Sequence, residues 1–165
     1  MDGLDETPDE ELVAQAQARL GPRAAAALQA ARQEAAALGR GYVCTEHLLV
    51  GLARERDSVA ARALAALQLS AETLHQRVYF IAGRGNGAVV EPSALPLSPR
   101  MRHVLVSAEH EAARRGLTEI GTIHLLVGLV RERVGLAVLL LHVPGIGLER
   151  IGVEILRCVR EGARD

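Results

Sequence analysis

The chain has 165 residues, of which 49% are apolar and 24% charged, and this balance is typical of a folded globular domain rather than a disordered segment. Its net charge of -1 gives no electrostatic argument for a nucleic acid or an anionic membrane as a partner. Aromatic residues make up 2%, which argues against a base-stacking surface, and the absence of lysine excludes Schiff-base chemistry.

Residues 1–18 are predicted to form a polar, acidic tail that is helical from about Asp9. This segment lacks the basic and apolar regions of a signal peptide, and the most apolar stretch of the chain, 134–141, is far shorter than a membrane span. Cys44 and Cys158 are isolated thiols rather than a disulfide framework. We therefore expect a cytoplasmic protein that does not insert into membranes.

The first half of the chain, residues 19–82, is predicted to hold four helices. Each begins at a residue that suits a helix start, because proline lacks an N–H that the first turn leaves unpaired, and Ser or Thr oxygens accept from free amides. In chain order these residues are Pro22, Thr45 (as the N-cap of a helix from Glu46), Ser58 and Ser70. The helices run to about Leu38, Arg54, Leu67 and Ile81, and Gly39 ends the first.

Residues 83–97 are rich in Gly and Pro and are predicted to be a flexible linker, and residues 98–165 then repeat the scheme of the first half. The helices of this second half are predicted from Ser98-Pro99 to Gly116, from Thr122, and around 136–142 and 148–160, with Pro144-Gly145 between the last two. A period-two pattern that would indicate a strand is lacking throughout.

The two halves are copies of one unit. Residues 45–52, Thr-Glu-His-Leu-Leu-Val-Gly-Leu, match residues 122–129, Thr-Ile-His-Leu-Leu-Val-Gly-Leu, at seven of eight positions with an offset of 77. The same offset aligns Glu34 with Glu111, Gly39 with Gly116, and Arg54 with Arg131. Because a chance match would not keep its register over such a span, we predict an all-α domain of two tandem, pseudo-symmetric four-helix repeats, with about eight helices.

The doubled motif resembles the N-terminal domain of Clp ATPases over about Leu20 to Arg160, since each copy follows a helix ending in Leu-Gly or Gly and precedes Arg-Glu. The resemblance implies a non-catalytic module that recognises protein substrates, degradation tags or adaptor proteins. The sequence contains no Gly-x-x-x-x-Gly-Lys-Ser/Thr motif, so an ATPase is not part of it. The chain is then either similar to stand-alone relatives that act as adaptors, competitors or decoys, or a fragment of a larger ATPase.

The resemblance also implies candidate site residues. In some family members the Glu of each Thr-Glu-His motif binds the guanidinium of phosphoarginine, and Glu46 stands at that position. Its counterpart is Ile123, which offers no charge-assisted acceptor, so at most one such site is expected. Glu46 can equally be a favourable charge at a helix N-terminus. The candidate ligand-binding residues are Glu46, Arg23, Thr45, Ser98 and Arg100.

His47 and His124 are predicted to be structural, with one ring nitrogen hydrogen-bonded to the backbone, and we group them with Thr45 and Thr122 as helix caps. Cys44 and His47 have the spacing of half a metal site, but the sequence supplies no further ligands nearby. We therefore predict no metal and no other cofactor.

A difference between the copies suggests a partner surface. Arg62 in the first copy corresponds to Leu139 in the second, next to Val138, so this helix loses its polar face. Either the N-terminal tail covers Val138 and Leu139, or they form an apolar surface for another chain.

We predict a recognition module that binds protein substrates, adaptors or tagged proteins, with a Clp ATPase as a further partner. The alternative is a stand-alone decoy that sequesters cyclic peptides or other small molecules directed at the Clp machinery. An enzyme is not predicted, because the motifs supply no nucleophile with a base and no paired carboxylates. The sequence leaves the ligand and the oligomeric state open.

Overall fold

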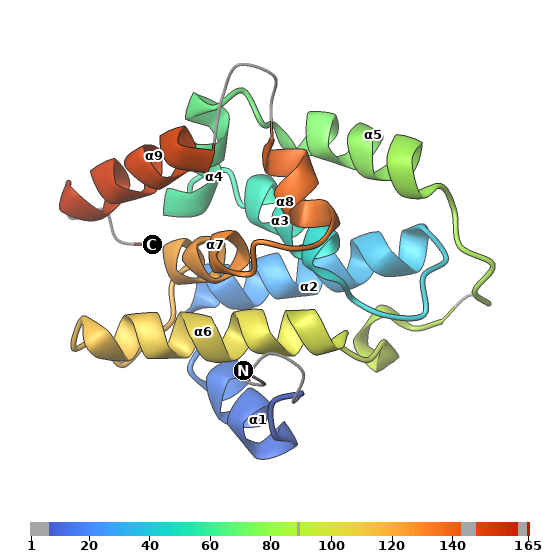
Figure 1. Ribbon diagram of the computed structural model, residues 1–165. Helices are drawn as coiled ribbons and strands as arrows, with labels where there is room; N and C mark the ends of the chain where they lie inside the picture. The colour runs from blue at the N-terminus through green and yellow to red at the C-terminus, as the bar shows by residue number, and fades with distance from the viewer. Residues whose placement is uncertain (1–6, 89, 143–147, 162–164) are drawn as a thin grey trace, which may run out of the picture.

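The computed structural model describes residues 7–88, 90–142, 148–161 and 165, and these residues form helices and loops but no β-strand (Figure 1). The all-α class with two four-helix repeats is as predicted. An additional helix, α1 (Glu10–Ala18), precedes them. The first repeat contains α2 (Pro22–Ala37), α3 (Thr45–Arg54), α4 (Val59–Ala66) and α5 (Ala71–Ala82). After a short 3-10 helix, η1 (Pro92–Ala94), the second contains α6 (Pro99–Arg114), α7 (Thr122–Arg131), α8 (Leu136–Leu141) and α9 (Leu148–Arg160).

The two repeats share one hydrophobic core because their shorter helices cross between them. Helix α8 of the second repeat packs on α3 and α5 of the first, whereas α4 of the first repeat packs on α7 and α9 of the second. In the middle of the molecule α3 contacts α7 directly (Figure 1). Buried leucine, valine and alanine side chains from both repeats fill the space between these helices. Neither repeat therefore buries its apolar faces alone.

Short backbone pairings join the start of each long helix to the other repeat. Leu20, before α2, forms a parallel bridge with Ile120, before α7. Val43, before α3, forms the equivalent bridge with Leu97, before α6. The starts of α3 and α6 therefore lie together, and so do the starts of α2 and α7.

Serine caps open three helices as predicted: the side chains of Ser58, Ser70 and Ser98 accept hydrogen bonds from backbone amides in the first turns of α4, α5 and α6. The N-cap prediction for Thr45 and Thr122 is wrong by one residue, because both threonines are the first residues of their helices.

The N-caps of α3 and α7 are Cys44 and Gly121, and each is fixed by the histidine three residues later. The Nδ1 atoms of His47 and His124 accept the backbone N–H of Cys44 and Gly121, both at 2.9 Å. This is the reach-back contact that Glu or Gln makes in a capping box. The histidine therefore sets where the helix begins.

The predicted N-terminal tail and the predicted linker both contain residues that contact the helices of the two repeats. Helix α1 packs against α6 and buries Val13 and Ala16, so residues from Asp9 onward are not a tail. In the predicted linker, the amides of Gly85 and Gly87 donate to the carbonyls of Leu38 and Gly39 at 2.8 and 2.9 Å. The proposed linker bounds of 83–97 stay a prediction, and Pro144-Gly145 lies outside the described residues.

Within the described part of the chain, no helix combines the length and the apolar composition that crossing a bilayer would require.

Candidate functional site

The starts of α3 and α6 bring together four of the five candidate ligand-binding residues. Backbone hydrogen bonds fix this junction: the N–H of Val43 donates to Pro96 at 2.9 Å, and the N–H of Ser98 donates to Val43 at 3.0 Å. Thr45 and Glu46 follow at once on α3, and Arg100 lies in the first turn of α6. We call Thr45, Glu46, Ser98 and Arg100 the α3/α6 site.

The side chains of the α3/α6 site differ in their access to solvent. Thr45 is 3% exposed, Glu46 and Ser98 are half-buried, and Arg100 is exposed. Gly135, at the start of α8, forms one wall, because a Cβ built on it would lie 3.1 Å from Arg100 Nη1 and 3.6 Å from Thr45 Oγ1. The site thus presents a carboxylate, the Ser98 hydroxyl and a guanidinium within one turn of two helices, while the Thr45 hydroxyl is buried beneath them.

Cys44 and His47 border this site but do not favour nucleophilic or metal chemistry. Burial and the negative charge of Glu46 raise the pKa of the Cys44 thiol, so at neutral pH it is protonated and a poor nucleophile. Ligand atoms of Cys44, Glu46 and His47 lie within 4.8 Å of one another. However, a thiol must lose its proton to bind a metal, and burial and the negative charge of Glu46 oppose that loss at Cys44. The absence of a metal stays a prediction.

Arg23, the fifth candidate, lies elsewhere. It follows the start of α2, which pairs with the start of α7 and not with α3. Its guanidinium is 4.0 Å from the exposed carboxylate of Asp57. Arg23 is the counterpart of Arg100 in the internal repeat, and the fold places the two at opposite junctions.

We call the paired starts of α2 and α7 the second junction. There the counterpart of Glu46 is apolar and buried. Ile123 is 7% exposed, and Gly21 stands at the N-cap of α2, where it offers no side-chain hydroxyl. The second junction therefore does not repeat the chemistry of the α3/α6 site.

The predicted partner surface is reduced to one residue. Leu139 is 64% exposed, but Val138 is 6% exposed and belongs to the interior. Helix α1 lies against α6, on the side of the molecule opposite α8 (Figure 1), so the described part of the N-terminal segment, residues 7–18, does not cover α8. Leu139 as a partner contact stays a prediction.

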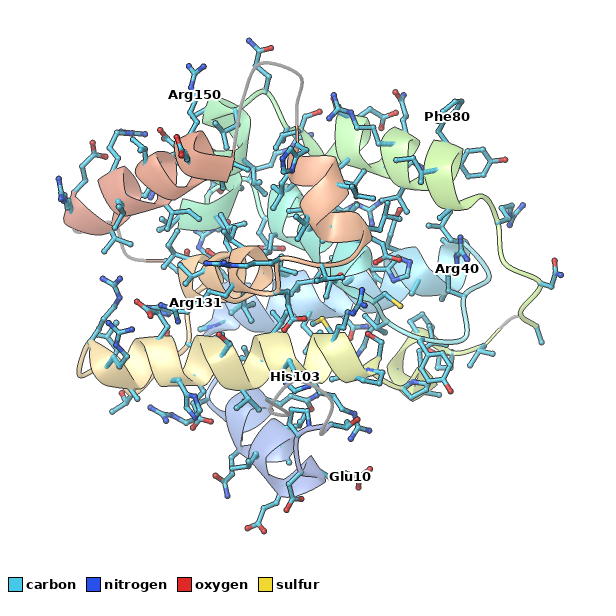
Figure 2. The ribbon with its side chains drawn as sticks, in the orientation of Figure 1. Glu10, Arg40, Phe80, His103, Arg131 and Arg150 are labelled. Carbon is cyan, nitrogen blue, oxygen red and sulfur yellow. The ribbon has the colours of Figure 1, made fainter. Side chains whose placement is uncertain are left out.

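Sequence reasoning missed a buried ion pair in each repeat. The carboxylate of Glu34 accepts from Arg54 at 2.6 Å, and the carboxylate of Glu111 accepts from Arg131 at 2.7 Å. Both carboxylates are almost fully buried, and Arg131 lies at the end of α7 where this helix runs beside α6 (Figure 2). A signal was present, because both partners recur at the same offset.

We expect the two capping histidines to make the free energy of unfolding depend on pH in the acidic range. Burial lowers the pKa of His47 and of His124, so the unfolded chain binds these protons more readily than the folded chain. Their contribution to stability is then complete above the unfolded pKa of about 6.5 and is lost as pH falls from there towards the lower folded pKa. In the variant His47→Gln/His124→Gln, whose glutamine oxygens can still accept the cap amides, we expect a smaller loss of stability on acidification below about pH 6.5.

Urea unfolding at a series of pH values measures this difference. His110→Gln, at an exposed position of α6, is the control and is expected to follow the wild type. Parallel curves for the double variant and the wild type would contradict the prediction.

Comparison with known proteins gives one family. The profile of the family described as the Clp repeat N-terminal domain matches residues 19–143. The chain is 35% identical over 139 residues to the negative regulator of genetic competence ClpC/MecB of Bacillus subtilis, covering 84% of this chain and 17% of that protein. It is 34% identical over 145 residues to the chloroplastic chaperone ClpC of Pisum sativum, covering 88% of this chain and 16% of that protein.

Solved structures show the same fold. The N-terminal domain of the chaperone ClpD from Arabidopsis thaliana superposes with a TM-score of 0.72 at 22% identity, covering 87% of this chain and 96% of that one. A ClpV N-domain solved in complex with a VipB peptide superposes with a TM-score of 0.67 at 18% identity, covering 95% and 98%.

Proposed function

The chain belongs to the Clp repeat N-terminal domain family, and on this premise we propose that it is a non-catalytic recognition module that binds substrates, adaptors or tagged proteins at the α3/α6 site. A relative of the same fold was solved with a peptide, which supports a role in binding proteins. The chain spans 17% of the length of the relative from B. subtilis. We propose in addition that a Clp ATPase is one of its partners and that it acts in the cytoplasm.

The composition of the α3/α6 site carries the proposal. Glu46 is a half-buried acceptor for a cationic group, and the exposed Arg100 with the hydroxyl of half-buried Ser98 suits an anionic one. A phosphoarginine side chain has both groups, a guanidinium joined to a phosphoryl group. The site therefore favours a modified arginine over a plain arginine or a plain phosphate.

Replacing Glu46 with glutamine is expected to weaken binding of a phosphoarginine-containing peptide about tenfold or more, because a hydrogen bond to a charged group contributes about 1.5 kcal/mol or more. Titration calorimetry with the phosphoarginine peptide and the same peptide carrying plain arginine measures the effect. Glu72→Gln is the matched control, since it removes one exposed negative charge from α5. Equal affinities of the two variants would refute the role of Glu46.

The second candidate function is sequestration of apolar or cyclic peptides, and the exposed side chain of Leu139 is the observation that favours it. A thermal-shift screen of phosphoarginine, arginine and apolar cyclic peptides separates the two functions. Stabilisation by apolar peptides that survives Glu46→Gln would support sequestration.

A further inference from the structure

A carboxylate of the chain itself lies at the start of α7, next to the start of α4. The side chain of Asp165 lies where α4 and α7 begin: its Oδ1 accepts the Thr122 hydroxyl at 2.7 Å and the backbone N–H of Val59 at 3.0 Å. Its Oδ2 accepts the backbone N–H of Thr122. We call Val59, Gly121 and Thr122 the Thr122 cradle.

The Thr122 cradle is built for an oxyanion. Two of its donors are free first-turn amides of helices, where the helix dipole also favours negative charge, and the third is the hydroxyl of a fully buried threonine. That hydroxyl is fixed from behind, since it accepts the N–H of Ala60 at 3.2 Å. The donors are therefore held in place by the fold rather than by the carboxylate.

Gly121 leaves the space that the carboxylate fills. A Cβ at this position would lie 2.7 Å from Asp165 Oδ2, closer than atoms tolerate. In the first repeat the same position is Cys44, which carries a side chain where Gly121 has none. The position two residues later also differs, because Glu46 of the first repeat is replaced by Ile123, which removes a negative charge from the start of α7. The two helix starts have thus diverged: Glu46 favours a cationic group at the start of α3, whereas the start of α7 has room for a carboxylate.

We propose that the Thr122 cradle is a carboxylate-binding site, which Asp165 fills in cis and an acidic side chain of a partner protein fills when Asp165 leaves. Asp165 is an exposed residue, so the Thr122 cradle lies near the protein surface. A tethered group competes at an effective concentration of about millimolar, which a partner that also binds elsewhere on the domain can exceed. In the proposed recognition role, the Thr122 cradle would bind an acidic side chain of the partner, whereas Glu46 would bind a cationic group.

The test uses N-acetyl-aspartate N-methylamide as the probe and its asparagine counterpart as the neutral control. In nitrogen-15 NMR spectra of Asp165→Ala, we expect the probe to shift the amides of Thr122 and Val59 and to bind about tenfold or more tightly than to the wild type, since the tethered competitor is gone. Asp57→Ala is the matched variant, because it removes an exposed carboxylate close to the start of α4 without opening the cradle. It is expected to bind the probe like the wild type.

Two further measurements keep the proposal open to refutation. Gly121→Ala added to Asp165→Ala is expected to abolish the gain, because the methyl group fills the space of the carboxylate. Titration of the wild type to high probe concentration is expected to shift the same two amides, which provides a test even if Asp165→Ala fails to fold.

If the asparagine compound binds equally well, or if neither amide shifts in the variant and the wild type, Asp165 is only a helix cap and the proposal is wrong. The probe carries no guanidinium, so its failure leaves the proposed function at the α3/α6 site intact. Loss of phosphoarginine binding would likewise leave this inference intact.

Discussion

Replacing Gly51 with alanine is expected to destabilise the domain by about 2 kcal/mol, as overpacking of a tight interior typically does, even after the gain of about 1 kcal/mol in helix propensity. Gly51 lies in the middle of α3, where this helix crosses α2. A Cβ there would overlap the backbone carbonyl oxygen of Ala27 and would lie 3.0 Å from the backbone N of Ala31. Because both atoms belong to a packed helix backbone, no side-chain rotation relieves the contact.

The internal repeat supplies the control for this prediction. At Gly128, the counterpart of Gly51 on α7, a Cβ would lie 2.8 Å from the Val104 carbonyl oxygen and 3.2 Å from Val104 Cγ1. This approach is less severe and partly involves a side chain that can turn away. Urea unfolding followed by circular dichroism should show a clearly smaller loss for Gly128→Ala. Equal losses in the two variants would mean that the α2–α3 crossing is not the tighter one.

The fold was largely predictable from one feature, the offset of 77 between the halves. Helix starts marked by Ser58, Ser70 and Ser98 are local signals, and they placed their helices correctly. The starts of α3 and α7 were misplaced by one residue because two local signals compete there. Threonine is a common N-cap, but a histidine reaching back three residues fixes the preceding residue as the cap.

Contacts between distant segments were beyond the sequence. No local sequence pattern indicates that α4 packs on the second repeat and α8 on the first. The packing of α8 on the first repeat buries Val138 and leaves Leu139 exposed. The same holds for Asp165, which reaches Thr122 across 43 positions of the chain. The residues next to Asp165 in the sequence do not indicate that its carboxylate caps the start of α7.

The candidate site was half predictable for the same reason. Glu46 and Thr45 belong to the repeated motif, and the sequence placed them together. That Arg100 joins them and Arg23 does not depends on which helix starts pair, as the Val43–Leu97 and Leu20–Ile120 bridges show. The internal repeat makes Arg23 and Arg100 equivalent in sequence, and only the fold separates them.

Glu111 is expected to be the most sensitive charged residue of the second repeat. Replacing it with glutamine should cost about 2 kcal/mol at neutral pH, because hydrogen bonds to a charged group contribute about 1.5–3 kcal/mol and glutamine makes them without the charge. The carboxylate is 3% exposed and accepts from Arg115 and Arg131, both at 2.7 Å. Since the arginines are partly exposed, water can solvate them once the carboxylate is gone, which keeps the loss below that of a fully buried pair.

The pH dependence of this loss separates an ion pair from simple packing. Burial raises the pKa of Glu111, but the hydrogen bonds and charges of Arg115 and Arg131 outweigh it and leave the pKa below its usual value. A carboxyl group with a lowered folded pKa stabilises the protein above its unfolded pKa of about 4.3, and this stabilisation is lost as pH falls through the lower folded value. The difference in unfolding free energy between wild type and Glu111→Gln should therefore be constant from neutral pH to about pH 5 and shrink below about pH 4. Glu161→Gln, which breaks an exposed pair with Arg157, should show almost no difference at any pH, because surface pairs contribute little. A gap for Glu111→Gln that persists unchanged at low pH would mean that shape, and not charge, makes Glu111 necessary.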